Sequence, residues 1–416
     1  MMDSKFILEN LDLVKSSLAK RGSKFNLDEL VKLDQERKSF IQKIETLRKE
    51  RNELGRQNSP ETHERGKAVK AELKKLEPEL VTIEEKLSQL INQIPNIVMP
   101  ETPTGKSEAD NVVVKTIGSK TEFDFEPLDH VTLAEQNGWL DFERGAKVSG
   151  SQFYYTKGDL ALFELALIRY ATDFLTKKGF TLVNTPDLAK SRYYLGTGYN
   201  PQGPEAQIYT VEGEDLGLIA TAEVTLAGLH ADEILESKQL PLKYVGISHV
   251  FRKEAGAYGK YSKGLYRVHQ FTKVEMFVYC KPEDSAKMHL ELLGLEEELY
   301  QGLELPFRVL EMCAADLGAQ AARKFDLEAW MPGRKDYGEV TSTSNTTDYQ
   351  ARRLQIKFRS ANGKTQFVHT LNGTAITSSR VPIAIMENFQ QKDRSVRVPD
   401  SLVPYFGKPV MEALSQ

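Results

Sequence analysis

The chain has 416 residues, more than one compact core usually holds, which predicts two or three domains. Its 55 Lys and Arg against 59 Asp and Glu give a net charge of -4, so any attraction to nucleic acid must come from a local basic surface. Two cysteines, Cys280 and Cys313, lack neighbours at disulfide or metal-ligand spacing, which argues against a disulfide-rich secreted domain and favours a reducing, cytoplasmic setting. No run of eighteen apolar residues and no signal-like opening occur, so we expect a soluble protein.

Two heptad patterns lie in the amino-terminal region. The first series repeats every seven positions and comprises Leu33, Phe40, Leu47 and Leu54, with Ile44 on the same seam. After the breaker "RQNSPET", the second series alternates steps of four and three and comprises Val69, Leu73, Leu76, Leu80, Ile83, Leu87, Leu90 and Ile94. These patterns predict an antiparallel helical hairpin, a coiled-coil arm over about 30–95, with a kink at Pro78.

The distal half of this arm is basic. Between Arg37 and Lys75 there are twelve Lys or Arg and six Glu, a local excess of six positive charges. A solvated helical face explains such a pattern, and so does a surface that contacts nucleic-acid phosphates. The charge pattern alone leaves both interpretations open.

The rest of the chain divides at a proline-rich stretch. We expect an amino-terminal domain over 1–100, a linker over 101–130 and a second domain over 131–416. In the last of these, helix-like "GDLALFELALIRYATDFLTKKG" precedes strand-like "FTLVNTPDL", and strand-like "YRVHQFTKVEMFVYC" comes later. A glycine turn "LNGT" and the helix-like "TSSRVPIAIMENFQQ" follow. Strand-rich stretches without a repeating β-α unit predict an α+β domain with an antiparallel sheet.

Some residues of this domain suit a nucleoside triphosphate, which needs cations for its phosphates, a ring for its base and carboxylates for magnesium. Arg252 and Glu254 are expected to alternate on one strand face, with Arg267 across the following loop and Phe271 available for stacking. Further along the chain lie the carboxylate and hydroxyl of "GEVTSTSN" and the arginine of "TSSR". Each of these residues alone has an ordinary structural explanation, so the functional interpretation depends on the order in which the motifs occur.

That order resembles the class II aminoacyl-tRNA synthetases and, among them, the seryl-tRNA synthetase family. Motif 1 resembles "GFTLVNTPDL", motif 2 "FRKEAGAYGKYSKGLYRVHQFTKVE" and motif 3 "LNGTAITSSRVPIAIMENFQ". The segments "ENLDLVKSSLAKRG", "LRKERN", "GTG", "TAE" and "DYQARR" also match, so that the resemblance covers nearly the whole chain.

The resemblance implies a class II antiparallel sheet with flanking helices, a homodimer formed through motif 1, and an arm that binds tRNA(Ser). It implies activation of L-serine with ATP to seryl-adenylate and pyrophosphate, and transfer of serine to the 3' end of tRNA(Ser), with tRNA(Sec) as a further substrate where one exists. Magnesium is the metal expected. Zinc is not, because the cysteines match no ligand positions and "TAE" is typical of the zinc-free type.

The resemblance also assigns site residues. The implied catalytic residues are Arg252 and Arg380. Arg252 is implied to contact the α-phosphate and the serine carboxylate, and Arg380 the distal phosphates. The implied ATP-binding set is Arg252, Lys253, Glu254, Arg267, Val268, Phe271, Glu339, Val340, Thr341, Ser342 and Arg380. In this set Arg267 joins Arg380 at the distal phosphates, and Glu339 and Ser342 are magnesium ligands. The implied serine-binding set is Thr221, Ala222, Glu223, Glu275 and Thr374.

The chain departs from the family's common patterns in two places, with "NGTA" for "NGSG" and "EVTSTSN" for "EVSSCSN". Thr374 therefore adds a methyl group to the implied serine pocket but keeps the hydroxyl. Two rival hypotheses are a related ligase that charges a carrier protein and an inactive paralogue that acts through its coiled coil. The long arm argues against the first, and the intact motif residues argue against the second.

Overall fold

The computed structural model describes residues 4–56, 59–199, 208–254 and 263–414. By its internal contacts the chain divides into two compact units, Met1–Ile97 and Val98–Gln416, each of which is described by itself. Among the described residues, no helix combines the length and the apolar character needed to cross a membrane.

The first unit is helical. Its elements are α1 (Ser4–Glu9), α2 (Leu11–Lys20), α3 (Leu27–Leu54) and α4 (Pro60–Gln93). Helix α3 begins after Asn26, whose side chain accepts a hydrogen bond from the Asp28 N–H. Helix α4 begins with a capping box between Ser59 and Thr62, with Pro60 at its first position, where a missing N–H costs nothing.

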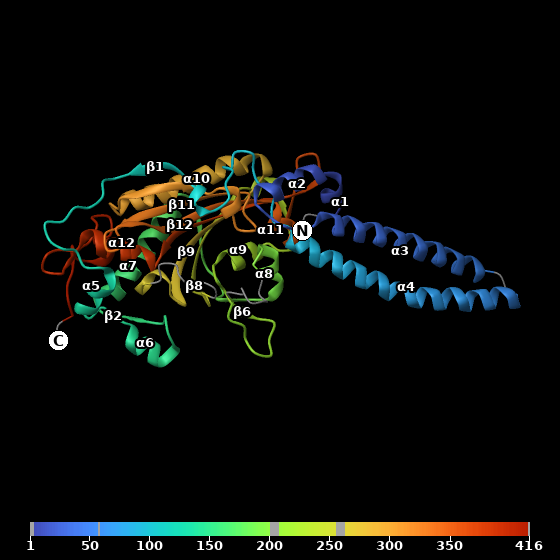
Figure 1. Cartoon of the computed structure of the whole chain (residues 1–416), viewed down its shortest axis with the longest axis horizontal. Coiled ribbons are helices and arrows are strands. Elements are labelled where there is room, and N and C mark those ends of the chain that lie inside the picture. Colours follow the sequence, from blue (N-terminus) through green and yellow to red (C-terminus); the bar gives the residue numbers. More distant parts are fainter. Residues whose placement is uncertain (1–3, 57–58, 200–207, 255–262, 415–416) are drawn as a thin grey trace. The chain divides into compact units, whose positions relative to one another are not determined.

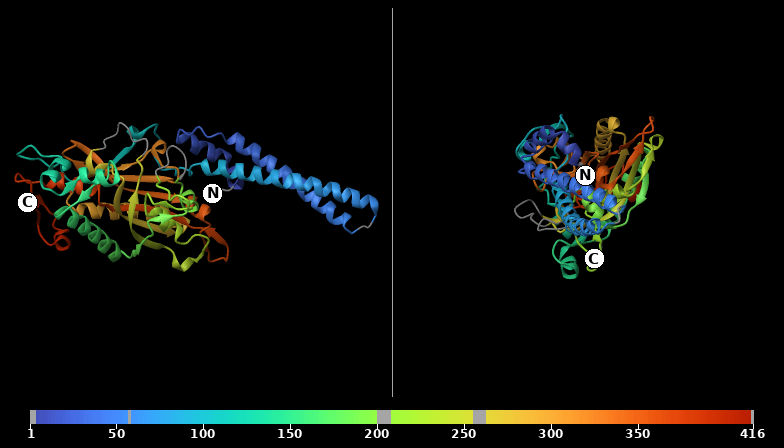
Figure 2. Two further views of the ribbon diagram at one scale, coloured as in Figure 1. Left: turned by 90° about the horizontal axis from the view of Figure 1, so that it is seen from below. Right: turned by 90° about the vertical axis from the view of Figure 1, so that its right-hand side faces the viewer.

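Helices α3 and α4 run side by side in opposite directions, which confirms the predicted hairpin (Figures 1 and 2). The heptad residues form the seam: Ile44 and Leu47 of α3 are buried with Val69 and Leu73 of α4. Helix α3 begins at Leu27, earlier than the heptad series indicates, because its first turn packs on α1 and α2 in a separate cluster. Helix α4 is continuous through Pro78.

The second unit contains an eight-stranded sheet in the order β1-β10-β11-β12-β15-β9-β8-β4. These strands are β1 (Val112–Ile117), β10 (Phe307–Glu311), β11 (Arg323–Met331), β12 (Asp336–Thr347), β15 (His369–Thr377), β9 (Gln270–Cys280), β8 (Leu242–Phe251) and β4 (Thr181–Asn184). All neighbours pair antiparallel except β4 and β8, which are parallel, so the predicted α+β class with an antiparallel-dominated sheet is confirmed.

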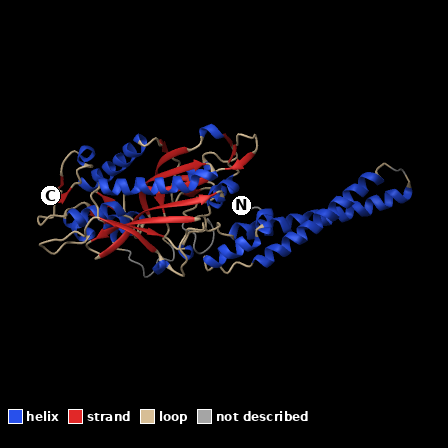
Figure 3. Ribbon diagram, turned by 90° about the horizontal axis from the view of Figure 1, so that it is seen from above, coloured by secondary structure: helices blue, strands red, loops and turns tan. Residues whose placement is uncertain are grey.

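The other described elements surround this sheet (Figure 3). The helices are α5 (His130–Gln136), α6 (Phe142–Ser149), α7 (Asp159–Lys177), α8 (Ser191–Thr197), α9 (Glu223–Gly228), α10 (Ser285–Gly302), α11 (Tyr349–Leu354), α12 (Arg380–Phe389) and α13 (Val403–Phe406). The smaller strands are β2 (Leu140–Asp141), β3 (Tyr155–Thr156), β5 (Leu188–Ala189), β6 (Gly217–Leu218), β7 (Ile234–Glu236), β13 (Lys357–Arg359), β14 (Thr365–Phe367), β16 (Val396–Arg397) and β17 (Val410–Met411).

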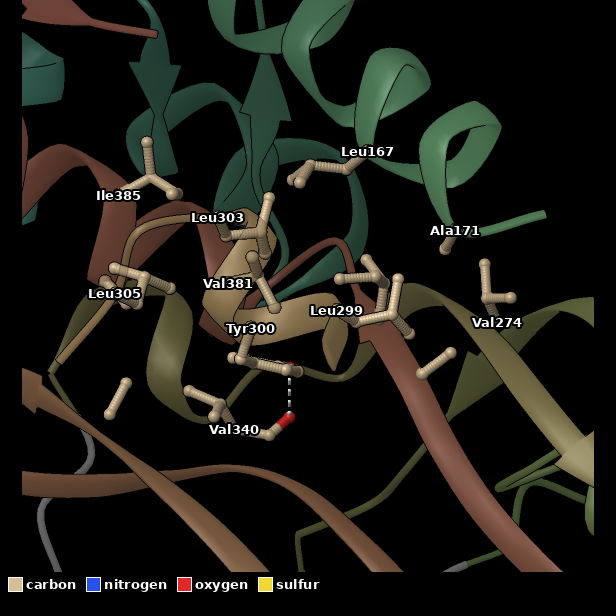
Figure 4. Close-up of a cluster of buried hydrophobic side chains, with 14 of the residues drawn as sticks. Leu167, Ala171, Val274, Leu299, Tyr300, Leu303, Leu305, Val340, Val381 and Ile385 are labelled. Carbon is tan, nitrogen blue, oxygen red and sulfur yellow. Dashed lines mark hydrogen bonds between the residues drawn. The ribbon is translucent and has the colours of Figure 1, made fainter. Parts of the chain in front are cut away.

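Three helices cover one face of the sheet. Leu167 of α7, Leu299 of α10 and Val381 of α12 meet Val274 of β9 and Val340 of β12 in one buried cluster (Figure 4). Burial of this apolar surface stabilises the sheet by about 25 cal/mol per Å² removed from water. These helices therefore cover this face, and a substrate-binding cavity is expected on the opposite face.

Three local expectations were wrong. Residues Val112–Ile117 of the expected linker form strand β1, because their backbone groups pair with β10 at the edge of the sheet. The expected turn "LNGT" lies inside strand β15. A Cβ at Gly373 would come within 2.9 Å of a carboxyl oxygen of Glu296, so this glycine allows close approach of α10 rather than a turn. Strand β8 ends at Phe251, before Arg252 and Glu254, so the strand does not set which way these two side chains point.

Candidate active site

The opposite face of the sheet is polar near the middle of β9 because of strand alternation. On β9, Val274 and Met276 point into the core beneath the helices. Because successive side chains of a strand point to opposite faces, Lys273 and Glu275 point the other way, and both line a polar cavity. The cavity therefore lies on the side of the sheet opposite to α7, α10 and α12.

Most of the predicted site residues line this one cavity. They are Glu223, Arg252, Glu254, Val268, Phe271, Glu275, Glu339, Val340, Thr341, Ser342, Thr374 and Arg380. They come from α9, from the segments after β8 and before β9, and from β9, β12, β15 and α12, which are up to about 160 residues apart in the sequence. The structure thus brings together the two arginines and the carboxylates that the motifs single out.

A β-bulge directs Glu339 into the cavity. The register of β11 and β12 shifts between Leu327 and Glu328, so that Val340 is an extra residue on β12. Such an insertion reverses the facing of the residues beyond it, which places Glu339 on the same face as Ser342. Both side chains line the cavity, and the apolar Val340 packs toward the core.

Arg380 opens helix α12 and pairs with Glu339. Its Nη1 lies 3.1 Å from the Glu339 Oε1 and donates a second hydrogen bond of 3.1 Å to the Glu339 backbone oxygen. The guanidinium of Arg380 also lies 4.7 Å from the ring centre of Tyr266. Arg252 is held by a hydrogen bond from its Nε to the Ala220 oxygen at 3.3 Å and lies over the Phe271 ring at 5.2 Å.

Glu254 occupies a special backbone position after β8. Its φ of 48° lies in the left-handed region that residues with a side chain rarely adopt. Its carboxylate accepts a 3.0 Å hydrogen bond from Arg267 Nη1. Arg267 is therefore next to the cavity through Glu254 without lining it. Gly256 and Gly259 of the predicted loop lie outside the described residues.

The other end of the cavity holds two buried acids, Glu223 and Glu275, which are 3% and 2% exposed. Glu223 accepts hydrogen bonds from the Tyr199 hydroxyl at 2.8 Å and from Gln350 Nε2 at 2.6 Å. Burial, with the negative charge of Glu275 nearby, raises the pKa of Glu223 to about 6. Such a site attracts a cation.

Glu275 belongs to a chain of polar contacts. It forms an ion pair with Lys273. The Thr374 hydroxyl donates to Glu275 Oε2 at 3.3 Å and accepts from Lys273 Nζ at 3.4 Å. The hydroxyl of Thr341 in turn donates to the Thr374 backbone oxygen. Thr374 and Thr341 are thus fixed by partners on three neighbouring strands.

Besides Arg267, three predicted residues do not line the cavity, and their roles stay predictions. Thr221 accepts a hydrogen bond from the Glu223 N–H at 3.2 Å, and Ala222 is fully buried, so both shape the backbone around Glu223. Lys253 is exposed and lies 5.6 Å from the ring centre of Tyr209.

Several residues that line the cavity escaped the sequence reasoning. They are Tyr199, Tyr266, Lys273, Gly318, Gln320, Ala321, Lys324, Ser344, Asn372, Thr377 and Ser379. Alternation with Glu275 in "TKVE" was a signal that could have found Lys273. No comparable signal marks Lys324, because its facing depends on the pairing of β11 with β12. His269 links the segments after β8 and before β9, since its Nδ1 contacts the Arg252 backbone oxygen at 2.7 Å.

The oxygen donors fit magnesium rather than a softer metal. Glu339 and Ser342 offer a carboxylate and a hydroxyl on one face of β12, and Mg²⁺ prefers oxygen ligands from one or two side chains together with substrate phosphates. The described residues contain no group of three or more His, Cys, Asp and Glu arranged to hold a metal by protein ligands alone.

Comparisons with known proteins agree with this geometry. The family model for the tRNA synthetase class II core domain (G, H, P, S and T) matches residues 209–389, and the one for the seryl-tRNA synthetase N-terminal domain matches residues 1–98. With the antiparallel sheet and the arginine-lined cavity, the first match defines the catalytic core of a class II aminoacyl-tRNA synthetase.

Relatives along the full length specify the family. The serine-tRNA ligases of Dictyoglomus turgidum and Rubrobacter xylanophilus are 51% and 50% identical, with 98% and 99% of both chains covered. The crystal structure of seryl-tRNA synthetase from Pyrococcus horikoshii complexed with ATP has a TM-score of 0.92 at 43% identity, covering 100% of both chains. That of the cytoplasmic serine-tRNA ligase from Naegleria fowleri in complex with AMP has a TM-score of 0.85 at 34% identity, covering 98% of this chain and 96% of that one. The chain belongs to the seryl-tRNA synthetase family, and it is therefore an enzyme that activates serine with ATP and charges tRNA.

Proposed function

We propose that the polar cavity is the site of both half-reactions. A serine carboxylate oxygen attacks the α-phosphorus of ATP, the bond from that phosphorus to the bridging oxygen breaks, and pyrophosphate leaves. The terminal adenosine hydroxyl of tRNA then takes the seryl group and releases AMP. The observation that carries this proposal is the meeting of Arg252, Arg380, Glu223 and Glu275 in one cavity.

At the ATP end, catalysis rests on position and charge, since no protein nucleophile is needed. Arg252 holds the α-phosphate and the serine carboxylate together, for which its planar fork is suited, and Arg380 holds the distal phosphates. Phe271 and Val268 contact the adenine ring, and Glu254 accepts a hydrogen bond from the adenine amino group. Lys253, Arg267, Val340 and Thr341 complete the ATP-binding set.

Glu339 and Ser342 would hold magnesium, which would neutralise phosphate charge when bound with ATP. The pairing of Glu339 with Arg380 supports this assignment, because it keeps the carboxylate ionised. Burial works against ionisation of Glu339, but the positive charges of Arg380, Lys324 and Arg252 hold its pKa well below the usual range. We expect no zinc, since Cys280 and Cys313 are buried away from the cavity.

At the serine end, Glu223 and Glu275 provide negative charge for the substrate ammonium, and Thr374 offers its hydroxyl to the serine side chain. Thr221 and Ala222 belong to the same pocket through the backbone of Glu223. Hydroxyl recognition discriminates against alanine, because polar groups would be left unpaired. Serine-dependent exchange of pyrophosphate into ATP by the purified chain tests the whole assignment, and no exchange with serine would refute it.

We infer that residues 1–100 form a tRNA-binding domain and residues 131–416 the catalytic domain. Residues 101–130 lie between them in the sequence and add strand β1 to the edge of the catalytic sheet. The basic arm is suited to the sugar-phosphate backbone of the long variable arm of tRNA(Ser), and of tRNA(Sec) where that exists. Interhelical ion pairs such as Arg48 with Glu77 and Arg65 with Glu50 use part of the basic surface. Lys67, Lys70 and Lys74 remain exposed on α4.

The arm is tested by charge reversal. The triple variant Lys67→Glu, Lys70→Glu and Lys74→Glu should weaken tRNA binding and flatten its dependence on salt, by up to about 0.9 in slope for each phosphate that is no longer neutralised. Serine-dependent exchange should not change. Matched reversal of exposed lysines on the second unit (Lys238, Lys364 and Lys392) serves as control. Equal tRNA charging by both triple variants would refute the arm's role.

We propose that the enzyme is a cytoplasmic homodimer. Strand β4 is the last strand of the sheet, and its Leu182 is 46% exposed. Leu162 and Leu165 of α7 are 55% and 64% exposed, an unusual apolar surface for a free monomer. Leu165→Glu should halve the mass measured by analytical ultracentrifugation, whereas Leu290→Glu, a matched leucine that is 51% exposed on α10, should not. A wild-type monomer would refute the proposal.

A further inference from the structure

Lys324 lines the cavity, and the mechanism proposed above gives it no role. It pairs with Ser344 across β11 and β12, and Asp326 pairs with Ser342. Directly opposed residues of an antiparallel pair share one face of the sheet, so Lys324 lies on the same face as Ser342. Lys324 accordingly lines the cavity together with Arg252 and Arg380.

The partners of Lys324 place it at the phosphate end. Its Nζ lies 3.0 Å from Asp326 Oδ1, and the two side chains are 22% and 7% exposed. Asp326 is directly opposite Ser342, and Ser342 shares its face of β12 with Glu339, the ion-pair partner of Arg380. The ion pair of Lys324 with Asp326 therefore lies next to the residues proposed for magnesium and the phosphates rather than at the serine end with Glu223.

We propose that Lys324 is a further cation of the triphosphate subsite. When ATP binds, its ammonium group leaves Asp326 and contacts the phosphate oxygens that later leave as pyrophosphate. This inference rests on the proposed ATP site. An ammonium group is a compact charge with three donors, able to keep contact with a phosphate group that moves as its bond to the α-phosphorus breaks. Charge neutralisation of a leaving group is worth most in a site that excludes water.

Asp326 is suited to the part of a temporary partner. Its carboxylate accepts a 3.1 Å hydrogen bond from Lys324 Nζ, two residues away on the same strand. The ammonium group of Lys324 can turn from this carboxylate toward a phosphate oxygen in the cavity, because its side chain is long and flexible. The simpler interpretation, in which Lys324 only neutralises Asp326, makes a different prediction for a double variant.

The test uses Lys324→Met, Asp326→Asn and the double variant in serine-dependent exchange of the full chain. Removal of one charge-assisted hydrogen bond predicts a rise of roughly 10- to 100-fold in KM for ATP and for pyrophosphate in Lys324→Met. The KM for serine should stay within about twofold, and Lys324→Arg should keep part of the wild-type affinity. Asp326→Asn should leave the KM for ATP unchanged or lower it.

The double variant decides between the two interpretations. If Lys324 contacts phosphate, the double variant keeps the raised KM for ATP. If Lys324 only neutralises Asp326, the double variant returns to the wild-type KM, and the proposal is overturned. Because it removes both charges, the double variant leaves no unpaired carboxylate and carries the test should Lys324→Met not fold. Absence of exchange in the wild type would refute the proposed function instead.

Discussion

Substitution of Glu223 by Gln gives the sharpest test of the serine end. The change keeps the shape of the side chain and removes a negative charge from a position that is 3% exposed. It also disturbs the hydrogen bonds, because Tyr199 and Gln350 both donate to this carboxylate. The Gln350 oxygen already accepts from Thr370 at 2.9 Å, so Gln350 cannot turn over without loss of that hydrogen bond.

The expected loss of activity follows from this burial. Removing one member of a buried, hydrogen-bonded charge pair costs about 2–5 kcal/mol. At about 1.4 kcal/mol for each factor of ten, a central value near 3–4 kcal/mol lowers kcat/KM for serine by roughly 100- to 1,000-fold. The KM for ATP should change little, because Arg252 and Arg380 keep their partners.

The assay is serine-dependent exchange at varied serine and varied ATP, with the exposed Glu212→Gln as matched control. It should be repeated across pH. The pKa of Glu223 is raised to about 6, so the carboxylate is ionised above that pH and protonated below it. Wild-type KM for serine should therefore rise as pH falls through about 6, while Glu223→Gln should lack this step. A kcat/KM within threefold of wild type, or an effect on ATP alone, would refute the reasoning.

Three other substitutions test the serine pocket, the packing of the sheet and the arm. Thr374→Val keeps the shape but removes the hydroxyl between Lys273 and Glu275, so the KM for serine should rise about tenfold at constant KM for ATP, measured by the same exchange. Gly373→Ala places a Cβ within 2.9 Å of Glu296 and should destabilise the protein by about 1–3 kcal/mol, seen as a lower Tm. Leu73→Ala opens the buried seam of the arm, which should lower tRNA charging and leave exchange intact.

The helical arm was predictable because its signal is local. A seven-residue repeat fixes which side chains meet, and the breaker between the two series fixes the turn. The motif residues were predictable for a different reason: they resemble a known family in type and order. Neither kind of signal reports the facing of a side chain on a strand.

What the sequence did not reveal depends on distant pairing. Lys324 reaches the cavity because β11 pairs with β12 in one register, and Glu339 reaches it because of the bulge at Val340. Gly373 was expected in a turn, since nothing in "LNGT" shows that a helix about 80 residues earlier in the sequence packs a glutamate against it. Residues Val112–Ile117 form strand β1 because they pair with β10, and the prolines around them gave no sign of this pairing.

The charged side chains of the site form ion pairs, and charged groups of the substrates can take the place of one partner. Four ion pairs lie in or next to the cavity: Arg380 with Glu339, Arg267 with Glu254, Lys273 with Glu275, and Lys324 with Asp326. An isolated charge in such a place would cost several kcal/mol, so each group needs a partner before ATP and serine arrive. Phosphates, magnesium and the serine ammonium can replace these partners one for one, so binding exchanges ion pairs rather than creating buried charge. It follows that removing one member of a pair should impair the enzyme more than removing both, unless the member removed itself binds the substrate.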